Sequence, residues 1–407
     1  MKYFHLPATI AFLALVLLAA ATAHAKPLKV YILAGQSNMV GAAEERVIVG
    51  LKTDPSTRAL YDNIMDAEDT FRVFDDVQVT ALSGSKDNPV NRSGPLTIGF
   101  GGNLGGQPGA TGKSARKFGP ELGFGVTMRE HLKEPFLIIK TAWGGKSLRQ
   151  HFLSPSGVPV VGGEAETGTH YKMMCDYVRE VLADPGKHHP AYDPEQGYEI
   201  AGFVWFQGWN DMMGAKDPFY QATADKPAFA AYSELLAHFI RDLRKEFKAP
   251  EMPFVIGVIG TGGNPDEKNP FREAMAAPAD LPEFKGNVAA VHTAEYFDEK
   301  LGELVERGWR WQRPAWDPEN KYVDLRAKLA PLQEKLKEGE KLPTQGERAK
   351  VHWSVKKEMN DILYTPEEQE YLQQNHSNQG YHYLGSGKIF ARIGEAFAKA
   401  MIEMNQP

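Results

Sequence analysis

Residues 28–39 read LKVYILAGQSNM and are the most informative stretch of the chain. The first seven are apolar apart from one lysine and are followed by glycine, which is typical of a buried β-strand that ends in a turn. Ser37 comes directly after this turn, where a hydroxyl is exposed between a strand and a helix and can serve as a nucleophile. Met39 stands where the G-x-S-x-G elbow has its last glycine, so the α/β-hydrolase fold is disfavoured. Taken by themselves, Ser37 and Asn38 are better explained as a helix cap.

Further apolar runs alternate with amphipathic helical patterns along the chain. Strands are predicted at residues 28–34, 136–140, 200–206, 254–259 and 288–293, and the clearest helices at residues 228–247 and 389–401. Continuous apolar strands that alternate with helices favour an α/β fold with a parallel sheet covered on both faces. In such sheets ligands bind beyond the carboxyl ends of the strands, so the residues that follow each strand are candidates for the chemistry.

The composition is that of a globular protein with a signal peptide. The chain has 407 residues, 42% of them hydrophobic, and a net charge of −6, and it lacks a long Lys/Arg cluster. This pattern excludes a disordered chain and makes a nucleic-acid partner unexpected.

Residues 1–25 combine Lys2, an apolar run and a final Ala-His-Ala, which predicts a cleaved signal peptide and a secreted or periplasmic protein with no membrane partner. The single cysteine, Cys175, is expected to be a buried, inert thiol.

The mature chain, residues 26–407, is interpreted as one domain with two irregular regions. Residues 82–119 are rich in glycine and lack periodicity, which predicts an ordered surface loop near the site or a mobile lid. From about 298 to 374 the chain is strongly charged, with weak helical patterns at residues 322–338 and 365–373. We interpret this region as a helical insertion packed on one end of the sheet.

Three other segments place polar or glycine residues next to predicted strands or helices. They read IKTAWGGKSL (139–148), VWFQGWND (204–211) and NQGYHYLG (378–385). Gly144 and Gly145 would let backbone N–H groups approach a developing oxyanion, and Asn210 could donate a side-chain N–H to it. His382 is the one histidine in the last segment. Each feature alone fits a turn, a cap or a structural histidine. Together with Ser37, however, these residues would supply a nucleophile, oxyanion donors and a base at one edge of the predicted sheet.

In these blocks the sequence resembles the SGNH (GDSL-like) hydrolases, and within them the sialate O-acetylesterase and carbohydrate esterase family 6 branch, which includes acetylxylan esterases. The resemblance rests on residues 35–39, 140–148, 207–211 and 382–385, and on FGPE at residues 118–121. It implies a three-layer α/β/α flavodoxin-like fold and ester hydrolysis through an acyl-enzyme. No metal or organic cofactor is expected.

The resemblance also implies roles for individual residues. Ser37 would be the nucleophile and His382 the base. The oxyanion hole would consist of the Ser37 N–H, an N–H of Gly144 or Gly145, and the Asn210 side chain. The residues expected to contact substrate are Gln36, Gln207 and Trp209.

The sequence departs from the family pattern at two positions. Gln379 stands where the family usually has an aspartate three residues before the histidine, and Trp209 stands where an acidic residue often follows Gln-Gly. An amide can orient an imidazole, but it cannot stabilise imidazolium as a carboxylate does. Either a Ser–His dyad acts alone, or another acid reaches His382; Asp211 and Glu295 are the candidates.

The resulting hypothesis is a secreted carbohydrate O-acetylesterase that acts on acetylated glycans such as xylan, pectin or sialic acid. The alternatives are a catalytically weak glycan-binding protein on the same fold and an esterase for longer acyl chains.

Other motifs do not support nucleotide or metal binding. Residues 109–114 resemble the end of a P-loop but lack its first glycine, and His188-His189 lacks the spacing of a metal site. Exposed tryptophans could stack on sugars, although several are expected to be core residues; the candidates are Trp143, Trp205, Trp209, Trp309, Trp311 and Trp316.

Overall fold

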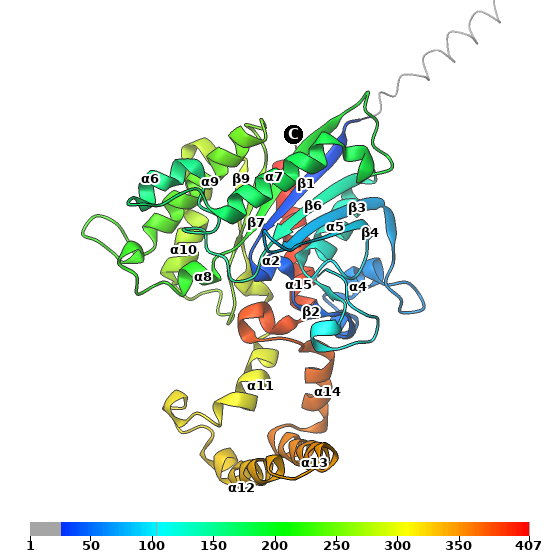
Figure 1. Ribbon diagram of the computed structural model, residues 1–407, viewed down its shortest axis with the longest axis vertical. Coiled ribbons are helices and arrows are strands. Elements are labelled where there is room, and N and C mark those ends of the chain that lie inside the picture. The colour runs from blue at the N-terminus through cyan, green and yellow to red at the C-terminus, as the bar shows by residue number, and fades with distance from the viewer. Residues whose placement is uncertain (1–25, 103, 407) are drawn as a thin grey trace, which may run out of the picture.

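A seven-stranded sheet forms the centre of the protein (Figure 1). The computed structural model describes residues 26–102 and 104–406, so the predicted signal peptide lies outside the described residues. In spatial order the strands are β4 (Pro89–Leu96), β3 (Phe74–Gly84), β6 (Phe136–Ala142), β1 (Leu28–Gly35), β7 (Tyr198–Phe206), β8 (Phe254–Val258) and β9 (Val288–His292). All neighbouring strands are parallel except β3 and β4. The five predicted strands are therefore present.

Helices cover both faces of the sheet, as predicted. Alternate residues of β1 point to opposite faces: Tyr31 and Leu33 belong to one hydrophobic core, and Val30 and Ile32 to the other. The first core is covered by α3 (Val49–Thr53), α4 (Arg58–Ile64), α5 (Pro120–Leu132) and α15 (Gly387–Met404), and the second by α7 (Thr169–Ala183), α9 (Ala230–Glu246) and α10 (Pro270–Ala276). Shorter elements are α2 (Ser37–Val40), α6 (Val158–Val161), α8 (Trp209–Met212) and the strand pair β2 (Ala43–Glu44) and β5 (Lys117–Phe118).

The strand order places β1 in the middle of the sheet. From β1 the chain first builds β3, β4 and β6 on one side and then β7, β8 and β9 on the other. The order differs from the flavodoxin order 2-1-3-4-5 because β6 lies between β1 and β3. The reversal at β1 is a topological switch point, and ligands bind at such points beyond the carboxyl ends of the strands.

The prediction for residues 82–119 was wrong for its first part. The end of β3 and all of β4 lie there as an antiparallel hairpin, and the irregular chain begins only after Leu96. The apolar pattern missed both strands for a physical reason. The β3 strand carries the polar residues Asp75, Asp76 and Gln78, and β4 is an edge strand in which Leu96 alone is buried.

The segment interpreted as an insertion contains four α-helices and extends away from the α/β body (Figure 1). It consists of α11 (Glu299–Arg310), α12 (Val323–Glu340), α13 (Gln345–Leu363) and α14 (Pro366–Asn375). A small core of its own joins α12 and α13, with Trp311, Leu332 and Met359 among its buried members. At its base, α11 contacts the turn η10 (Gly380–Gly385) and α14 contacts α3. The insertion therefore begins beside the turn that carries the candidate histidine.

Cys175 lies in α7 and is 3% exposed. Burial raises the pKa of its thiol to about 12, so the thiol is protonated and inert, as expected. Within the described residues, no helix is both long enough and apolar enough to cross a membrane.

Candidate active site

The carboxyl ends of β6, β1 and β7 meet at the switch point. Gly35, the last residue of β1, approaches the end of β7 so closely that a Cβ atom on it would lie 2.1 Å from the carbonyl oxygen of Phe206. The Gly35 φ angle of +155° also favours glycine. This close approach brings the residues that follow β1 and β7 side by side.

Ser37 and the glycine pair are neighbours at this edge. Trp143 N–H donates to the carbonyl oxygen of Gly35 at 3.1 Å, which holds the end of β6 against the end of β1. A Cβ atom on Gly144 would lie 3.8 Å from Cβ of Ser37. Gly144 and Gly145 are exposed, and Ser37 is half-buried. Within residues 26–102 and 104–406, the backbone N–H groups of these three residues have no hydrogen-bond acceptor. The structure thus brings together the predicted nucleophile and two of its predicted oxyanion donors.

Gln36 links the serine segment to the asparagine segment. Its Oε1 accepts hydrogen bonds from Gln207 Nε2 at 3.1 Å, Gly208 N at 3.2 Å and Asn210 N at 3.4 Å. Trp209 and Asn210 form the start of the short helix α8. The Asn210 side chain is half-buried and has no hydrogen-bond partner among the described residues. The backbone of Asn210 is therefore held next to Ser37 while its side-chain amide remains available to a ligand.

Gln207 is a second buried link. Its Nε2 donates to Lys146 O at 3.0 Å and Asp211 Oδ2 at 2.6 Å, and its Oε1 accepts from Tyr232 OH at 3.0 Å. Gln36 and Gln207 are each 1% exposed. In this ligand-free structure Gln36 Oε1 and the Gln207 amide join loops inside the protein, while Gln36 Nε2 has no hydrogen-bond partner among the described residues, so substrate contact by these two residues stays a prediction. Trp209, by contrast, is half-buried and lines a cavity.

Asp211 does not pair with the histidine. Its carboxylate accepts from Leu148 N at 2.9 Å, Arg149 N at 3.2 Å and Tyr220 OH at 2.6 Å, and the residue is 1% exposed. Burial raises the pKa of this carboxyl, and the hydrogen bonds oppose the rise. Asp211 holds the loop after the glycine pair against α8. The prediction that it could be the acid partner of His382 is therefore wrong, because its carboxylate faces other groups.

His382 lies in the turn η10, which is anchored through the next residue. Tyr383 is fully buried; its hydroxyl accepts from Gly260 N at 2.7 Å and shares a hydrogen bond of 2.5 Å with Thr293 Oγ1. These partners follow β8 and β9, so the turn is attached to the same edge of the sheet. Tyr383 has a φ of +49°, an uncommon conformation for a non-glycine residue that its buried contacts must maintain. The sequence did not single out Tyr383.

The ring of His382 is oriented by Asn378, a residue that sequence reasoning also missed. His382 Nδ1 lies 2.9 Å from Asn378 Oδ1, which also accepts from Gln379 N at 2.8 Å. Because a backbone N–H can only donate, the amide oxygen faces both groups, and Nδ1 carries the ring proton. Nε2 is then the unprotonated nitrogen and can act as a base. The sequence feature that could have indicated this role is the amide residue four positions before the histidine in the segment 378–385.

The two other suggested acids do not reach the ring. Glu295 is exposed in the turn after β9, and its carboxylate has no contact with His382 among the described residues. Gln379 contributes its backbone N–H to Asn378, while its side chain lines a cavity. Among the described residues the histidine therefore has no carboxylate partner, which corresponds to the dyad alternative.

Helix α2, which Ser37 opens, contacts the turn η10 that carries His382. No hydrogen bond joins the Ser37 hydroxyl to the His382 ring within the part of the chain that the structure describes. Catalytic hydrogen bonds are often long in ligand-free enzymes and shorten when substrate binds, so this separation is compatible with a Ser–His pair.

The pH dependence of catalysis should reveal the environment of His382. Burial, with a smaller contribution from Lys117, lowers the pKa of the imidazole to about 4. A base is active when unprotonated, so kcat/KM should fall on the acid side near pH 4 rather than near the ordinary value of 6.5. Asn378→Asp places a negative charge beside Nδ1, which favours imidazolium and should move this fall to higher pH. A wild-type fall near the ordinary histidine value, unchanged in the variant, would contradict this assignment.

A buried ion pair supports the serine segment from below. Lys140 Nζ donates to Glu121 Oε2 at 2.6 Å, to Phe100 O at 2.8 Å and to Val40 O at 2.9 Å. Glu121 also accepts from Gly119 N, and both charged side chains are almost fully buried. Burial lowers the pKa of Lys140. The pair joins the end of α2 to α5 and the glycine-rich segment, which explains FGPE as a structural element of the site.

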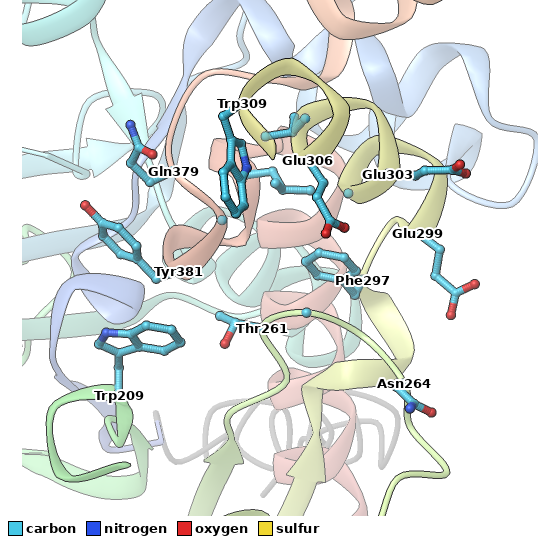
Figure 2. Close-up of a pocket in the computed structure, with 15 residues that line it drawn as sticks. Trp209, Thr261, Asn264, Phe297, Glu299, Glu303, Glu306, Trp309, Gln379 and Tyr381 are labelled. Carbon is cyan, nitrogen blue, oxygen red and sulfur yellow. The ribbon is translucent and has the colours of Figure 1, made fainter. Parts of the chain in front are cut away.

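A cavity of about 480 Å³ lies next to these groups (Figure 2). Trp209 and Tyr381, which precede Asn210 and His382 in the chain, line one end, and residues of α11 line the other. Among residues 26–102 and 104–406, no cluster of three His, Cys, Asp or Glu residues is arranged to hold a metal ion.

The chain is similar to a known protein family and to solved structures. The sequence model of a family described as carbohydrate esterase, sialic acid-specific acetylesterase, matches residues 27–300, a range that includes Ser37, Gly144 and Asn210 and ends before His382. Among solved structures, the chain is similar to a protein of Arabidopsis thaliana, with 19% identity, a TM-score of 0.37, and coverage of 66% of this chain and 86% of that one. It is also similar to a carbohydrate acetylesterase of Xanthomonas citri, with 15% identity, a TM-score of 0.38, and coverage of 69% of this chain and 55% of that one. No curated protein matches the chain.

Proposed function

This chain belongs to the sialic acid-specific acetylesterase family of carbohydrate esterases, and on that premise we propose that it removes acetyl groups from glycans through an acetyl-enzyme on Ser37. We further propose that it acts outside the cytoplasm, because residues 1–25 have the pattern of a signal peptide.

In the first half of the proposed reaction, Ser37 Oγ attacks the acetyl carbonyl carbon while its proton moves to His382 Nε2. The carbonyl oxygen becomes an oxyanion, and the N–H groups of Ser37 and Gly144 and the Asn210 side chain stabilise it. The bond between the carbonyl carbon and the sugar oxygen then breaks. The sugar oxygen takes the proton from Nε2, and the acetyl group remains on Ser37.

In the second half, His382 Nε2 takes a proton from water as the water oxygen attacks the acetyl carbonyl. The same donors stabilise the second oxyanion. Collapse of this intermediate releases acetate, and Ser37 Oγ recovers a proton from Nε2. Asn378 keeps the ring proton on Nδ1 throughout, which leaves Nε2 to exchange the proton in both halves.

One observation carries this proposal: the half-buried Ser37 lies beside the exposed Gly144, with Asn210 held to the residue before the serine. Three segments from distant parts of the sequence thus meet around one hydroxyl. Free N–H groups beside a hydroxyl suit a reaction in which negative charge develops on a carbonyl oxygen.

The test combines product analysis with labelling of the nucleophile. We expect the protein to release acetate from acetylated oligosaccharides, and an aryl phosphonate, which reacts with activated serines, to modify Ser37 as located by mass spectrometry. Binding of the glycan with neither acetate release nor labelling would support the glycan-binding alternative. Faster hydrolysis of longer acyl esters than of acetyl esters would contradict the acetyl preference.

Replacement of Asn210 by alanine should lower kcat about 100-fold or more, because one oxyanion-hole donor contributes roughly a factor of 10² to 10³. KM for a small aryl acetate should change little, since the interaction forms mainly in the transition state. The backbone N–H that holds residue 210 to Gln36 remains in the variant. Steady-state kinetics and a thermal unfolding curve are the measurements; a normal kcat with normal unfolding would remove Asn210 from the site.

A further inference from the structure

The cavity beside the candidate site has an aromatic end next to the proposed catalytic groups. The rings of Trp209 and Tyr381 have centroids 5.8 Å apart and are tilted by 33°. Each ring belongs to a residue that directly precedes a proposed catalytic group, Asn210 or His382. A molecule that packs against the cavity side of these rings would therefore have part of its surface close to the proposed reacting centre.

The opposite wall belongs to the insertion. Figure 2 shows Trp309 of α11 at the cavity, across from Tyr381 and Trp209. Trp309 is 37% exposed, and Trp316, which is 57% exposed, packs edge-on against it with centroids 6.1 Å apart. The aromatic surface thus continues from the cavity outward over the insertion. Trp143, Trp205 and Trp311 are at most 3% exposed, so these tryptophans are core residues.

Flat aromatic faces arranged along a groove suit the apolar faces of sugar rings, and a row of them suits a chain of sugars better than one sugar. The volume of about 480 Å³ lies within the range of sites for small ligands. Because the surface continues beyond the cavity, a bound oligosaccharide could extend from the reacting centre towards Trp316.

The charges in the cavity distinguish between classes of glycan. Its lining includes Glu299, Glu303 and Glu306, and none of the described residues that line it is Lys, Arg or His. Ion pairs connect Glu303 to Lys321 and Glu306 to Arg310, and neither cation lines the cavity. Carboxylates accept hydrogen bonds from sugar hydroxyl groups, whereas they repel the carboxylate of a sialic or uronic acid. The lining is therefore suited to a neutral sugar.

We propose that the cavity between η10 and α11 is a subsite for a neutral glycan chain and that the insertion makes the enzyme act on acetylated oligosaccharides rather than on O-acetylated sialic acids. This inference rests on the proposed function, since it assigns the substrate class of that same site. Trp309 is its specificity-determining residue.

The experiment measures kcat/KM of the wild type and Trp309→Ala on an acetylated xylo-oligosaccharide and on 4-nitrophenyl acetate, which carries no sugar chain to occupy the proposed subsite. Truncation of an aromatic anchor in a binding site is expected to lower the ratio of the two values about fivefold or more. Trp353→Ala is the matched control, because Trp353 is 70% exposed on the same insertion but does not line the cavity. Its ratio should equal that of the wild type.

A ratio in Trp309→Ala equal to the wild-type ratio, or an equal loss in Trp353→Ala, would overturn the subsite. Wild-type preference for an O-acetylated sialic acid over the neutral oligosaccharide would overturn the assigned substrate class. Failure of the proposed function looks different: the wild type would then hydrolyse neither 4-nitrophenyl acetate nor any acetylated sugar.

Discussion

Replacing Ser37 with alanine should lower kcat for acetyl ester hydrolysis by between about 10⁴- and 10⁶-fold, as in serine hydrolases that lose their nucleophile. The hydroxyl oxygen is the only heavy atom removed, and no hydrogen bond joins it to the His382 ring within the described residues. The variant should therefore keep its fold and its glycan affinity while it loses the acetyl-enzyme. Rapid-quench detection of the acetylated protein and steady-state kinetics measure the two effects.

Ser147 provides a matched control for this prediction. It lies in the loop that follows β6 and the glycine pair. Its Oγ is 3.1 Å from His151 Nδ1, so it is a second serine in contact with a histidine. Ser147→Ala should retain wild-type kinetics. If Ser147→Ala abolished activity and Ser37→Ala did not, the nucleophile would be assigned to the wrong segment of the site.

His382→Ala is expected to lower kcat by a similar factor, about 10⁴-fold or more, because neither Ser37 nor water would then have a base. Asn378 makes a hydrogen bond to the ring without carrying charge, so its loss should cost much less than the loss of the ring. Residues that act as one unit have strongly non-additive effects. The double variant Ser37→Ala/His382→Ala should therefore be no slower than either single variant.

The measurement is kcat for 4-nitrophenyl acetate in the two single variants and the double variant, with thermal unfolding as a control for folding. Imidazole added to His382→Ala should restore part of the activity if the missing group is a base near Ser37. Multiplied losses in the double variant would instead show that the two residues act independently, and the Ser–His pairing would be withdrawn.

The predictable part of this protein was local in sequence. The five buried parallel strands were predicted because strands covered on both faces are continuous apolar runs. The serine, glycine and asparagine segments could be brought together in advance, since the carboxyl ends of parallel strands share one edge. The β4 strand could not be recognised, because an exposed edge strand has no apolar pattern to detect.

The hydrogen-bond partners of buried polar side chains could not be predicted from the sequence. Gln36 and Gln207 were singled out as polar residues after two strands, but the sequence did not indicate that both would be buried with their amide oxygens bonded inside the protein. Asp211 is a carboxylate near the site in sequence and in space, but its oxygens face Leu148, Arg149 and Tyr220. A hydrogen-bond partner is selected by geometry in three dimensions, which residue type and spacing do not specify.

By itself, the sequence determined the alternation of strands and helices and the positions of Ser37, Gly144 and Asn210 just after strands, because these features follow from short-range patterns. The tertiary structure alone decided that Asn378 orients the imidazole, that Tyr383 attaches its turn to the sheet, and that α11 closes a cavity beside it. The reason is physical: each of these contacts joins side chains whose directions depend on how the turn η10 and the insertion pack against the completed sheet.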